Sequence, residues 1–474
     1  MDNKKYLFTE TTPTFYNKKN ETSNNSVSLS KTNDIDFRSV QSVLQFGAIV
    51  PPLSPWVDVA RFLPGSTYQG TTFIETNSPN DYREQSEPLI TVDSFQRKIE
   101  KIVDAHILSA MSESSAPPVV LFSGGVDSGF LASRLVALGF QDTLLINYSF
   151  GNEDRESDLA KSMAKELGLR YERVSKETTD NHDVLFRPGQ IYSQPFGDVS
   201  VVPTSELALA VSNALGGDRR VIFDGTGADG AFGMTDKVHT WKNIYKFPEL
   251  LRRAIATSYL IFWNTNGSFE LYSRIIKRSS QMPISAAVVA QNALRGILYT
   301  DEHSSSLNLC LQKWVEDVAG RSHAHQIVAA DLALTCANVF AQKALAPLAA
   351  NGHKLIFPFL DQEIFEVALK YIDLNNSPEN KAPLKNSLCR HVPKHMVWRP
   401  KSGFADTSNS IFYSTEVLEK FRRTTDENGP ISTAIHKNNV TRICDLLSKK
   451  KPLSAQVFNF IWAATFTDRW FRTV

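Results

Sequence analysis

The stretch VVLFSGGVDSGFLASRL, residues 119–135, decides the fold because its character changes halfway along. It begins as an apolar strand, passes through a short run of glycine and serine, and continues as a helix. Gly124 and Gly125 let backbone N–H groups approach an anion without interference from side chains. The helix, which we expect to start near Ser128, directs its dipole and its free N–H groups to the same spot, and Ser123 and Ser128 add hydroxyl donors. The turn therefore predicts a pocket for pyrophosphate.

Asp127 lies inside this turn and would repel a bare phosphate, so its presence predicts a bridging cation, most simply Mg2+. The structural alternative is a helix capped by Ser or Asp after a tight glycine turn, but a cap needs only one such residue. The Walker pattern GxxxxGK[ST] and the lysine that belongs to it are absent.

Strands and helices alternate outward from this stretch. The predicted strands are 117–122, 143–150, 169–175 and 220–225, and the predicted helices between them are 93–112, 128–138, 156–168 and 205–215. This order indicates an α/β fold with a parallel sheet flanked by helices. Residues 236–350 and 454–471 carry helical patterns, so a large helical C-terminal lobe should follow the sheet.

The N-terminal region has a different composition. Residues 18–34 are polar and rich in Asn and Ser, which favours a flexible segment, and 36–75 look like a short ordered subdomain with several prolines. We therefore divide the chain into a reduced N-terminal domain, 1–93, and a synthetase-like domain, 94–474.

Composition limits the classes of function. The 474 residues carry a formal net charge of +1, which gives no broad electrostatic case for binding nucleic acid or an anionic membrane. The four cysteines form no CxxC pair, and we find neither a signal peptide nor an apolar run of the roughly 20 residues that span a bilayer. We expect a cytoplasmic protein; nothing in the sequence indicates its oligomeric state.

Several motifs together resemble one known family. SGGVDS at a strand end resembles the PP-loop of ATP pyrophosphatases. FDGTGADGAFG (223–233) resembles the SGEGADE-type loop of asparagine synthetases, and IFPFLDQEIFEVAL (356–369) resembles their PFLDHxLVExA stretch. Residues 381–407 resemble their K-x-x-LR…P…R-x-K-x-x-F segment. The matches follow the family's order over about 94–474, so the chain is identified as similar to asparagine synthetases, near β-lactam synthetases and lasso-peptide cyclases.

The resemblance implies an ATP-dependent ligase. A substrate carboxylate would attack the α-phosphorus of ATP, pyrophosphate would leave, and an amine would convert the acyl-adenylate into an amide or lactam and AMP. The carboxylate and the amine would belong to small molecules or to a peptide, in the biosynthesis of a specialised product. A peptide closing into a macrolactam, a β-amino acid forming a lactam and two separate small molecules all remain open.

The resemblance also implies roles for particular residues. Asp127 and Asp229 match the Mg2+-binding aspartates, and Lys401 matches the catalytic lysine, whose fixed ammonium could neutralise developing charge. The remaining matches concern ATP: Arg399 and Lys385 near the phosphates, and the backbones of Leu121, Ser149 and Gly225 near adenine and ribose. The structural alternatives are a plain turn at 227–230, a solvated basic loop at 399–401 and ordinary strand packing. Asp361 fits a helix cap better than a catalytic role.

The sequence departs from the family pattern in two places. Position 2 is Asp2 where glutaminase-bearing members have a nucleophilic cysteine, so we do not expect this chain to hydrolyse glutamine. On the amine side, Thr226 stands where asparagine synthetases have an acid, Gly230 where they have glutamate, and LIF (355–357) where many members have EVR. Threonine is a poor general base, which favours an acceptor different from that of asparagine synthetases. Other candidates to accept the amine's proton are Glu153, Glu156, Asp198 and His353.

Two other classes of protein compete with the ligase. A catalytically degenerate binding scaffold is favoured slightly by Thr226 and Gly230 and opposed by the retained Asp127, Asp229 and Lys401. A PP-loop enzyme that modifies tRNA is opposed by the balanced charge and by the missing CxxC.

Overall fold

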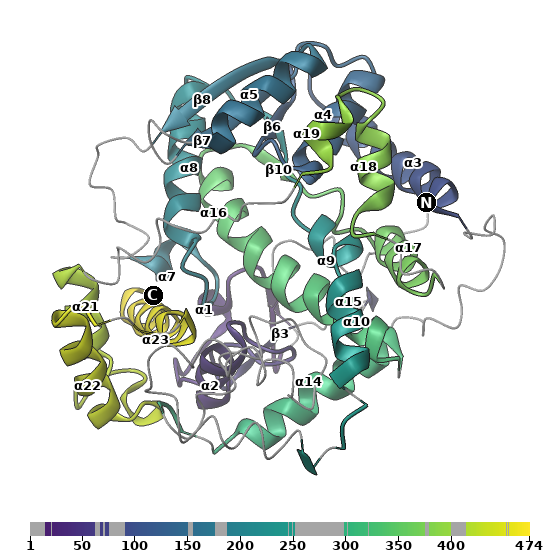
Figure 1. Cartoon of the computed structure of the whole chain (residues 1–474). Coiled ribbons are helices and arrows are strands. Elements are labelled where there is room, and N and C mark those ends of the chain that lie inside the picture. The colour runs from purple at the N-terminus through teal and green to yellow at the C-terminus, as the bar shows by residue number, and fades with distance from the viewer. Residues whose placement is uncertain are drawn as a thin grey trace.

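The structure is a computed structural model, and Figure 1 shows its arrangement. It describes residues 15–19, 21–61, 67–69, 72–74, 91–149, 155–175, 187–244, 246–248, 250–251, 298–300, 302–320, 322–374, 379–399, 414–451, 453 and 455–474.

The centre of the fold is a five-stranded sheet in the order β10-β9-β6-β7-β8, and every neighbouring pair is parallel. Its strands are β6 (Val119–Leu121), β7 (Leu144–Ser149), β8 (Arg170–Ser175), β9 (Val221–Phe223) and β10 (Lys354–Ile356). The predicted parallel sheet is confirmed. Strand β10 was not predicted, because only three residues pair with β9 and one of them, Lys354, is exposed.

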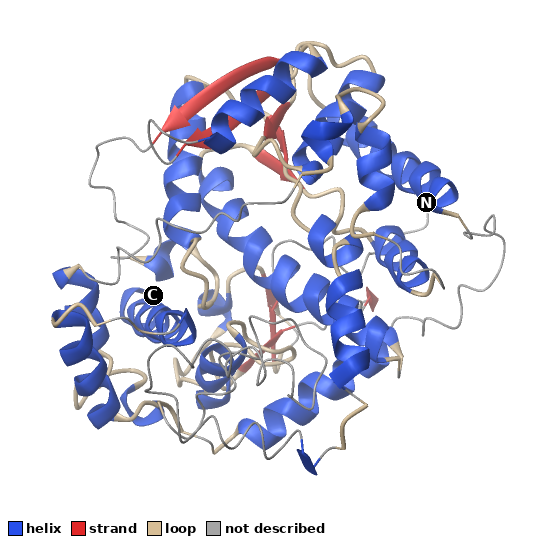
Figure 2. Cartoon of the chain, viewed as in Figure 1, coloured by secondary structure: helices blue, strands red, loops and turns tan. Residues whose placement is uncertain are grey.

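Helices cover both faces of the sheet. The chain moves from β6 through β7 to β8 by way of α4 (Val126–Ala137) and α5 (Arg155–Leu167), and right-handed crossovers place both helices on one face. It then returns to β9 by way of α8 (Val201–Ala214), which the same rule places on the opposite face. Helix α16 (Gln342–Ala350) packs beside α8, and Figure 2 shows these two on the other side of the strands from α5.

From residue 91 onwards the chain forms further helices. On α4 pack α3 (Val92–Met111) and α18 (Ala382–Leu388). The others are α7 (Pro188–Ile191), α9 (Ala228–Phe232), α10 (Thr235–Ile244), α14 (Ser304–Ala319), α15 (His323–Ala330), η2 (Asp331–Ala341), α17 (Gln362–Ile372), α19 (Lys394–Val397), α21 (Thr415–Arg423), η3 (Ser432–Ala434), α22 (Lys437–Ser448) and α23 (Ala455–Thr473). Asp361 caps α17 as predicted, since its carboxylate accepts a hydrogen bond from the Glu363 N–H.

One long apolar helix runs through the core as α15, η2 and α16, and its middle part, η2, is a π-helix. By length and composition, His323–Ala350 could also cross a membrane, which the sequence analysis did not anticipate. However, 61% of its most apolar window is buried inside the protein, and the core helix of a soluble protein passes the same test.

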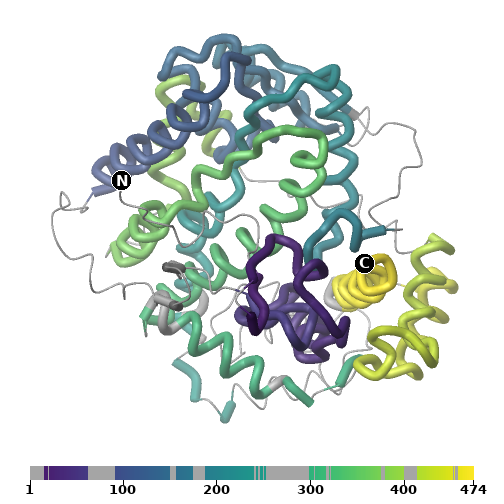
Figure 3. Tube along the Cα trace, turned by 180° about the vertical axis from the view of Figure 1, so that it is seen from behind, coloured from purple at the N-terminus to yellow at the C-terminus, as the bar shows by residue number. Residues whose placement is uncertain are grey.

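The N-terminal elements pack on the C-terminal helix (Figure 3). Strands β1 (Phe15–Asn17), β2 (Thr22–Ser23) and β3 (Val59–Arg61) form an antiparallel sheet beside α1 (Ser26–Leu29) and α2 (Phe37–Phe46), and β4 (Thr67–Gln69) pairs with β5 (Thr72–Ile74). The ring of Trp56 lies 5.8 Å from that of Trp470 in α23, and α2 contacts both α23 and α14. The polar segment 18–34, expected to be flexible, contributes β2 and α1.

Candidate active site

The glycine-serine turn joins β6 to α4 and packs tightly against α5. Gly124 has φ +70°, and a Cβ there would lie 2.7 Å from the Ala160 Cα, so both the conformation and the space require glycine. Ser128 Oγ accepts a hydrogen bond from the Ser123 N–H (3.2 Å), and Ser123 Oγ accepts one from the Gly125 N–H (3.3 Å). Helix α4 begins two residues before the predicted start at Ser128, with Gly125 as N-cap and no side-chain cap. The N-terminal end of α4 is thus open to a ligand.

The second glycine-rich loop, which follows β9, packs directly on the first. A Cβ on Gly225 would lie 2.8 Å from the Asp127 Cβ and 3.3 Å from the Ser128 backbone nitrogen. The Thr226 N–H donates a hydrogen bond of 2.7 Å to the Asp224 carboxylate, which shapes the turn. Because the parallel strands β6 and β9 are neighbours, their carboxyl ends bring the two motifs together at one edge of the sheet.

Lys381 links these two loops. Its ammonium lies 2.7 Å from a carboxylate oxygen of Asp127 and 2.6 Å from one of Asp229. Burial alone would lower the pKa of Lys381, but the two carboxylates outweigh burial and raise it. Lys381 itself has φ +58°, and its N–H donates to the Phe232 carbonyl, so the backbone before α18 is held in place as well. Segments more than 100 residues apart therefore meet at one ammonium group.

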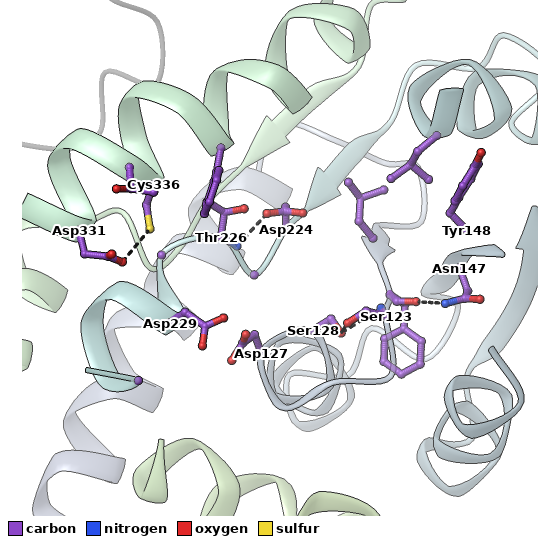
Figure 4. A pocket seen from close by; sticks show the side chains of 18 of the residues that line it. Ser123, Asp127, Ser128, Asn147, Tyr148, Asp224, Thr226, Asp229, Asp331 and Cys336 are labelled. Carbon is purple, nitrogen blue, oxygen red and sulfur yellow. Dashed lines mark hydrogen bonds between the residues drawn. The ribbon is translucent and has the colours of Figure 1, made fainter. Parts of the chain in front are cut away.

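A pocket of about 570 Å3 opens beside this cluster (Figure 4). Its wall comes from the ends of β6, β7 and β9, from α4, α8, α9 and α10, and from η2. The lining residues are Leu121, Phe122, Ser123, Asp127, Ser128, Ile146, Asn147, Tyr148, Leu207, Asp224, Gly225, Thr226, Gly227, Asp229, Gly233, Met234, Lys237, Asp331, Thr335, Cys336 and Phe340.

One end of the pocket is mostly apolar and is fixed by hydrogen bonds from β7. The Asn147 side chain donates to the Phe122 carbonyl (2.8 Å) and accepts from Ser157 (2.5 Å) and Tyr171 (3.2 Å). The Tyr148 hydroxyl donates to Glu206 (2.7 Å), and burial followed by this carboxylate raises the pKa of Tyr148. Asn147 and Tyr148 line this end of the pocket together with Leu121, Phe122 and Ile146.

The opposite end is acidic. Asp331, at the start of η2, is buried, and its carboxylate lies 3.9 Å from the Lys237 ammonium and 3.8 Å from the Cys336 sulfur. Burial raises the pKa of Asp331, of Asp224 and of Cys336. Figure 4 places Asp331 and Cys336 across the pocket from Asn147 and Tyr148, with Asp127 and Asp229 between the two ends.

The two aspartates of the centre fit the ligand set of Mg2+. Both carboxylates approach a single cation, the Lys381 ammonium, and Mg2+ is commonly held by one or two carboxylates together with substrate phosphates. In the part of the chain that the structure describes, no group of three or more His, Cys, Asp or Glu could hold a metal alone, so substrate oxygens would have to complete the shell. Four carboxylates line the pocket, and a polyphosphate would need such a cation to enter.

The structure brings half of the predicted site residues to the pocket. Seven line the pocket: Leu121, Ser123, Asp127, Ser128, Gly225, Thr226 and Asp229. The Arg399 guanidinium pairs with Glu156 (3.2 Å) and donates to the Gly124 carbonyl (3.3 Å), so it borders the turn from outside. Lys401 lies outside the described residues.

Other predicted residues do not line this pocket. The Ser149 hydroxyl accepts a hydrogen bond from Arg173 (2.6 Å), and the Lys385 ammonium lies 4.5 Å from the centroid of the Trp398 ring. Gly230 lies behind the wall, against Asp331 and Leu332.

The suggested proton acceptors are engaged elsewhere. Asp198 pairs with Lys343 at 2.7 Å, Glu156 pairs with Arg399, and His353 is buried against the Ser212 hydroxyl at 3.2 Å. None of these three lines the pocket described here, and Glu153 lies outside the described residues.

Sequence reasoning missed Lys381, Asp331, Asp224 and Asn147. Lys381 stands at the first position of the K-x-x-L pattern, which was quoted without a role for it. Asp224 directly follows β9, a position where polar residues of α/β sheets often meet ligands. Asp331 is a single charge in an apolar helical run, and such charges are rarely buried without a function or a partner. Asn147 carried no distinguishing signal.

Three comparisons relate the chain to known proteins. The family model for asparagine synthase matches residues 98–470, most of the chain. No curated protein matches the chain in sequence. Among solved structures, the chain is similar to the NMN synthetase from Francisella tularensis, with 16% identity and a TM-score of 0.22, over 30% of this chain and 58% of that one. That likeness is too low to support a conclusion about fold or function.

Proposed function

The chain belongs to the asparagine synthase family, and from that premise we propose that it is an AMP-forming carbon–nitrogen ligase that activates a carboxylate with ATP and couples it to an amine. The observation that carries the proposal is the meeting of the two glycine-rich loops and Lys381 at one edge of the sheet. Each loop supplies an aspartate, and the open N-terminal end of α4 supplies backbone N–H groups.

Each part of this edge has a task in the proposed reaction. The turn at 123–128 would bind the departing pyrophosphate through N–H groups and serine hydroxyls. Asp127 and Asp229 would hold Mg2+, which neutralises phosphate charge when bound. The Lys381 ammonium would keep the two carboxylates converged and offset their repulsion of ATP. Arg399 holds the turn through the Gly124 carbonyl, and Lys401, two residues further on, is the proposed catalytic ammonium.

The proposed substrates are a carboxylate and an amine carried by small molecules or by a peptide, and the proposed product is an amide or a lactam in the biosynthesis of a specialised compound. Thr226 at the pocket wall supports an acceptor different from that of asparagine synthetases. We propose that the enzyme works in the cytoplasm without nucleic acid or membrane partners, which the net charge of +1 supports.

Exchange of labelled pyrophosphate into ATP tests the proposal, because it reports the first step before the amine is known. Amino acids, sugar acids and small peptides are screened as acids, and we expect one class to promote exchange that requires Mg2+. Lys401→Ala should abolish exchange, and Lys354→Met, which removes an exposed lysine paired with Glu113, should preserve it. Release of ADP and orthophosphate in place of AMP would refute the ligase, and full function of Lys401→Ala would favour a binding scaffold.

A further inference from the structure

The π-helix η2 forms the acidic wall of the pocket. Backbone hydrogen bonds in a π-helix join residues five apart, so a face repeats after about five positions, and such segments often occur at functional sites. Asp331 and Cys336 are separated by that interval, and their side chains are in contact. With Thr335 and Phe340 they are the four residues that η2 contributes to the pocket wall. The helix type therefore aligns a carboxylate, a hydroxyl, a thiol and a ring along one side of the cavity.

Gly230 makes room for this wall. A Cβ on Gly230 would lie 3.1 Å from a carboxylate oxygen of Asp331 and 3.0 Å from a methyl carbon of Leu332, closer than side chains normally approach. Glutamate stands at this loop position in the family pattern that the sequence resembles. In this chain the loop lacks that glutamate, and a helix remote in sequence supplies a carboxylate to the same space.

The charges around Asp331 leave it suited to a cationic ligand. Its side chain is 8% exposed, while that of Lys237, 3.9 Å away, is 42% exposed, so an entering cation can displace this ammonium into solvent. A buried carboxylate gains most from a partner that arrives with a full positive charge and a hydrogen-bond donor. Met234 and Phe340 line the same pocket and add apolar surface to its wall, which a hydrocarbon chain attached to that charge would cover.

We propose that this end of the pocket, lined by Asp331, Thr335 and Phe340, binds the amine substrate as its ammonium ion, with Asp331 as the residue that selects for the charge. The inference rests on the proposed function, because an amine has a role only where a carboxylate has been activated. It concerns recognition of the second substrate and assigns no step of the chemistry to Asp331.

Once pyrophosphate exchange has identified the carboxylic acid substrate, two nucleophiles of different charge test the inference. Methylamine is almost entirely protonated at neutral pH, whereas hydroxylamine is mostly uncharged, and the amide and the hydroxamate are both quantified by mass spectrometry. In Asp331→Asn we expect the KM for methylamine to rise about tenfold, as for loss of a charge-assisted hydrogen bond, while the KM for hydroxylamine changes less than about twofold. Asp331→Glu keeps the charge and should restore the preference for methylamine.

Asp373→Asn is the matched control, since it removes an exposed carboxylate that pairs with His325 outside the pocket lining, and its KM values should equal those of the wild type. Thermal unfolding of each variant separates misfolding from altered recognition. Equal effects of Asp331→Asn on the two nucleophiles, or no effect on either, overturn the inference, as does a wild type that uses hydroxylamine but never methylamine. A wild type that shows no acid-dependent exchange refutes the proposed function itself, which is a different result.

Discussion

The centre of the pocket and its acidic end are built in different ways. In the centre, which we propose binds the phosphates (the phosphate site), backbone turns at the carboxyl ends of β6 and β9 form the wall, and Gly124 and Gly225 are required by close contacts with neighbouring backbone and side chains. At the acidic end, which we propose binds the amine (the amine end), side chains of helix η2 form the wall, and their positions depend on how that helix packs. Turn geometry restricts residue types, whereas a helix face accepts many side chains.

This difference explains which parts of the site keep the sequence motifs of the family. A polyphosphate needs N–H groups, carboxylates and a cation in a fixed arrangement, so the loops that provide them keep their motif. The amine end can change its charge by placing one aspartate on a helix and removing one side chain from a loop, as Asp331 and Gly230 do here. If the proposed function holds, substrate choice can therefore vary while activation of the carboxylate stays the same.

Removal of Lys381 should give the largest effect and tests the phosphate site. Lys381→Met leaves Asp127 and Asp229 without the ammonium that both contact, so their mutual repulsion opens the site. We expect pyrophosphate exchange to fall about 100- to 1,000-fold, the range for loss of a preorganised electrostatic group. Lys354→Met, at an exposed pair with Glu113, should stay within about twofold, since surface pairs contribute little. An exchange rate near that of the wild type in Lys381→Met would show that this ammonium has no part in the first step.

A pair of glycine substitutions separates the cost of backbone strain from the cost of overpacking. Gly124→Ala must accept φ +70° and a Cβ 2.7 Å from the Ala160 Cα, whereas Gly139→Ala accepts φ +90° with no atom within 4 Å. We expect about 1 kcal/mol of lost unfolding free energy for Gly139→Ala, from backbone strain alone. For Gly124→Ala we expect about 3 kcal/mol, because overpacking adds to that strain. Urea denaturation measures both, and equal losses would contradict the tight fit of the turn against α5.

The sequence was most informative where local rules act. The alternation of strands and helices predicted the sheet, and the apolar strand before SGGVDS placed the turn at a strand end. Asp361 was predicted as a cap because Asp before an amphipathic run is typical of one, and it caps α17. The three-residue strand β10 escaped prediction because its pairing with β9 depends on a partner about 130 residues away.

The amine end could not be predicted either, because it too depends on contacts between segments that are far apart in the sequence. A π-helix has no recognised signature in the residues of η2, which read as an ordinary apolar helix. The convergence of Asp331 with Gly230 depends on how α9 packs against η2, a tertiary contact. Lys381 was not predicted, because the motif around it identifies a segment of the chain and does not say where the lysine side chain points.

The last prediction concerns an ion pair that supports the amine end. Lys343 of α16, the helix that continues η2, donates to Asp198 at 2.7 Å and also contacts Ser200, both just before α8. Burial by itself would raise the pKa of Asp198, but Lys343 and the hydrogen bonds from Ser200 outweigh it, so the pKa is lowered. Asp198→Asn keeps the shape and removes the charge, and at pH 7 it should lower the unfolding free energy by about 2 kcal/mol.

The pH dependence of this loss follows from the direction of the shift. A carboxyl group with a lower pKa in the folded state stabilises the fold above its unfolded pKa, which is about 3.9, and that stabilisation disappears as the pH falls through the folded value. The difference between wild type and Asp198→Asn, measured by urea denaturation, should therefore be constant from about pH 7 to about pH 5 and shrink towards about pH 3. Asp373→Asn, at an exposed pair with His325, should cost less than about 0.5 kcal/mol at pH 7. A loss for Asp198→Asn that stays the same at every pH would show that the charge of Asp198 contributes nothing to joining α16 and α8.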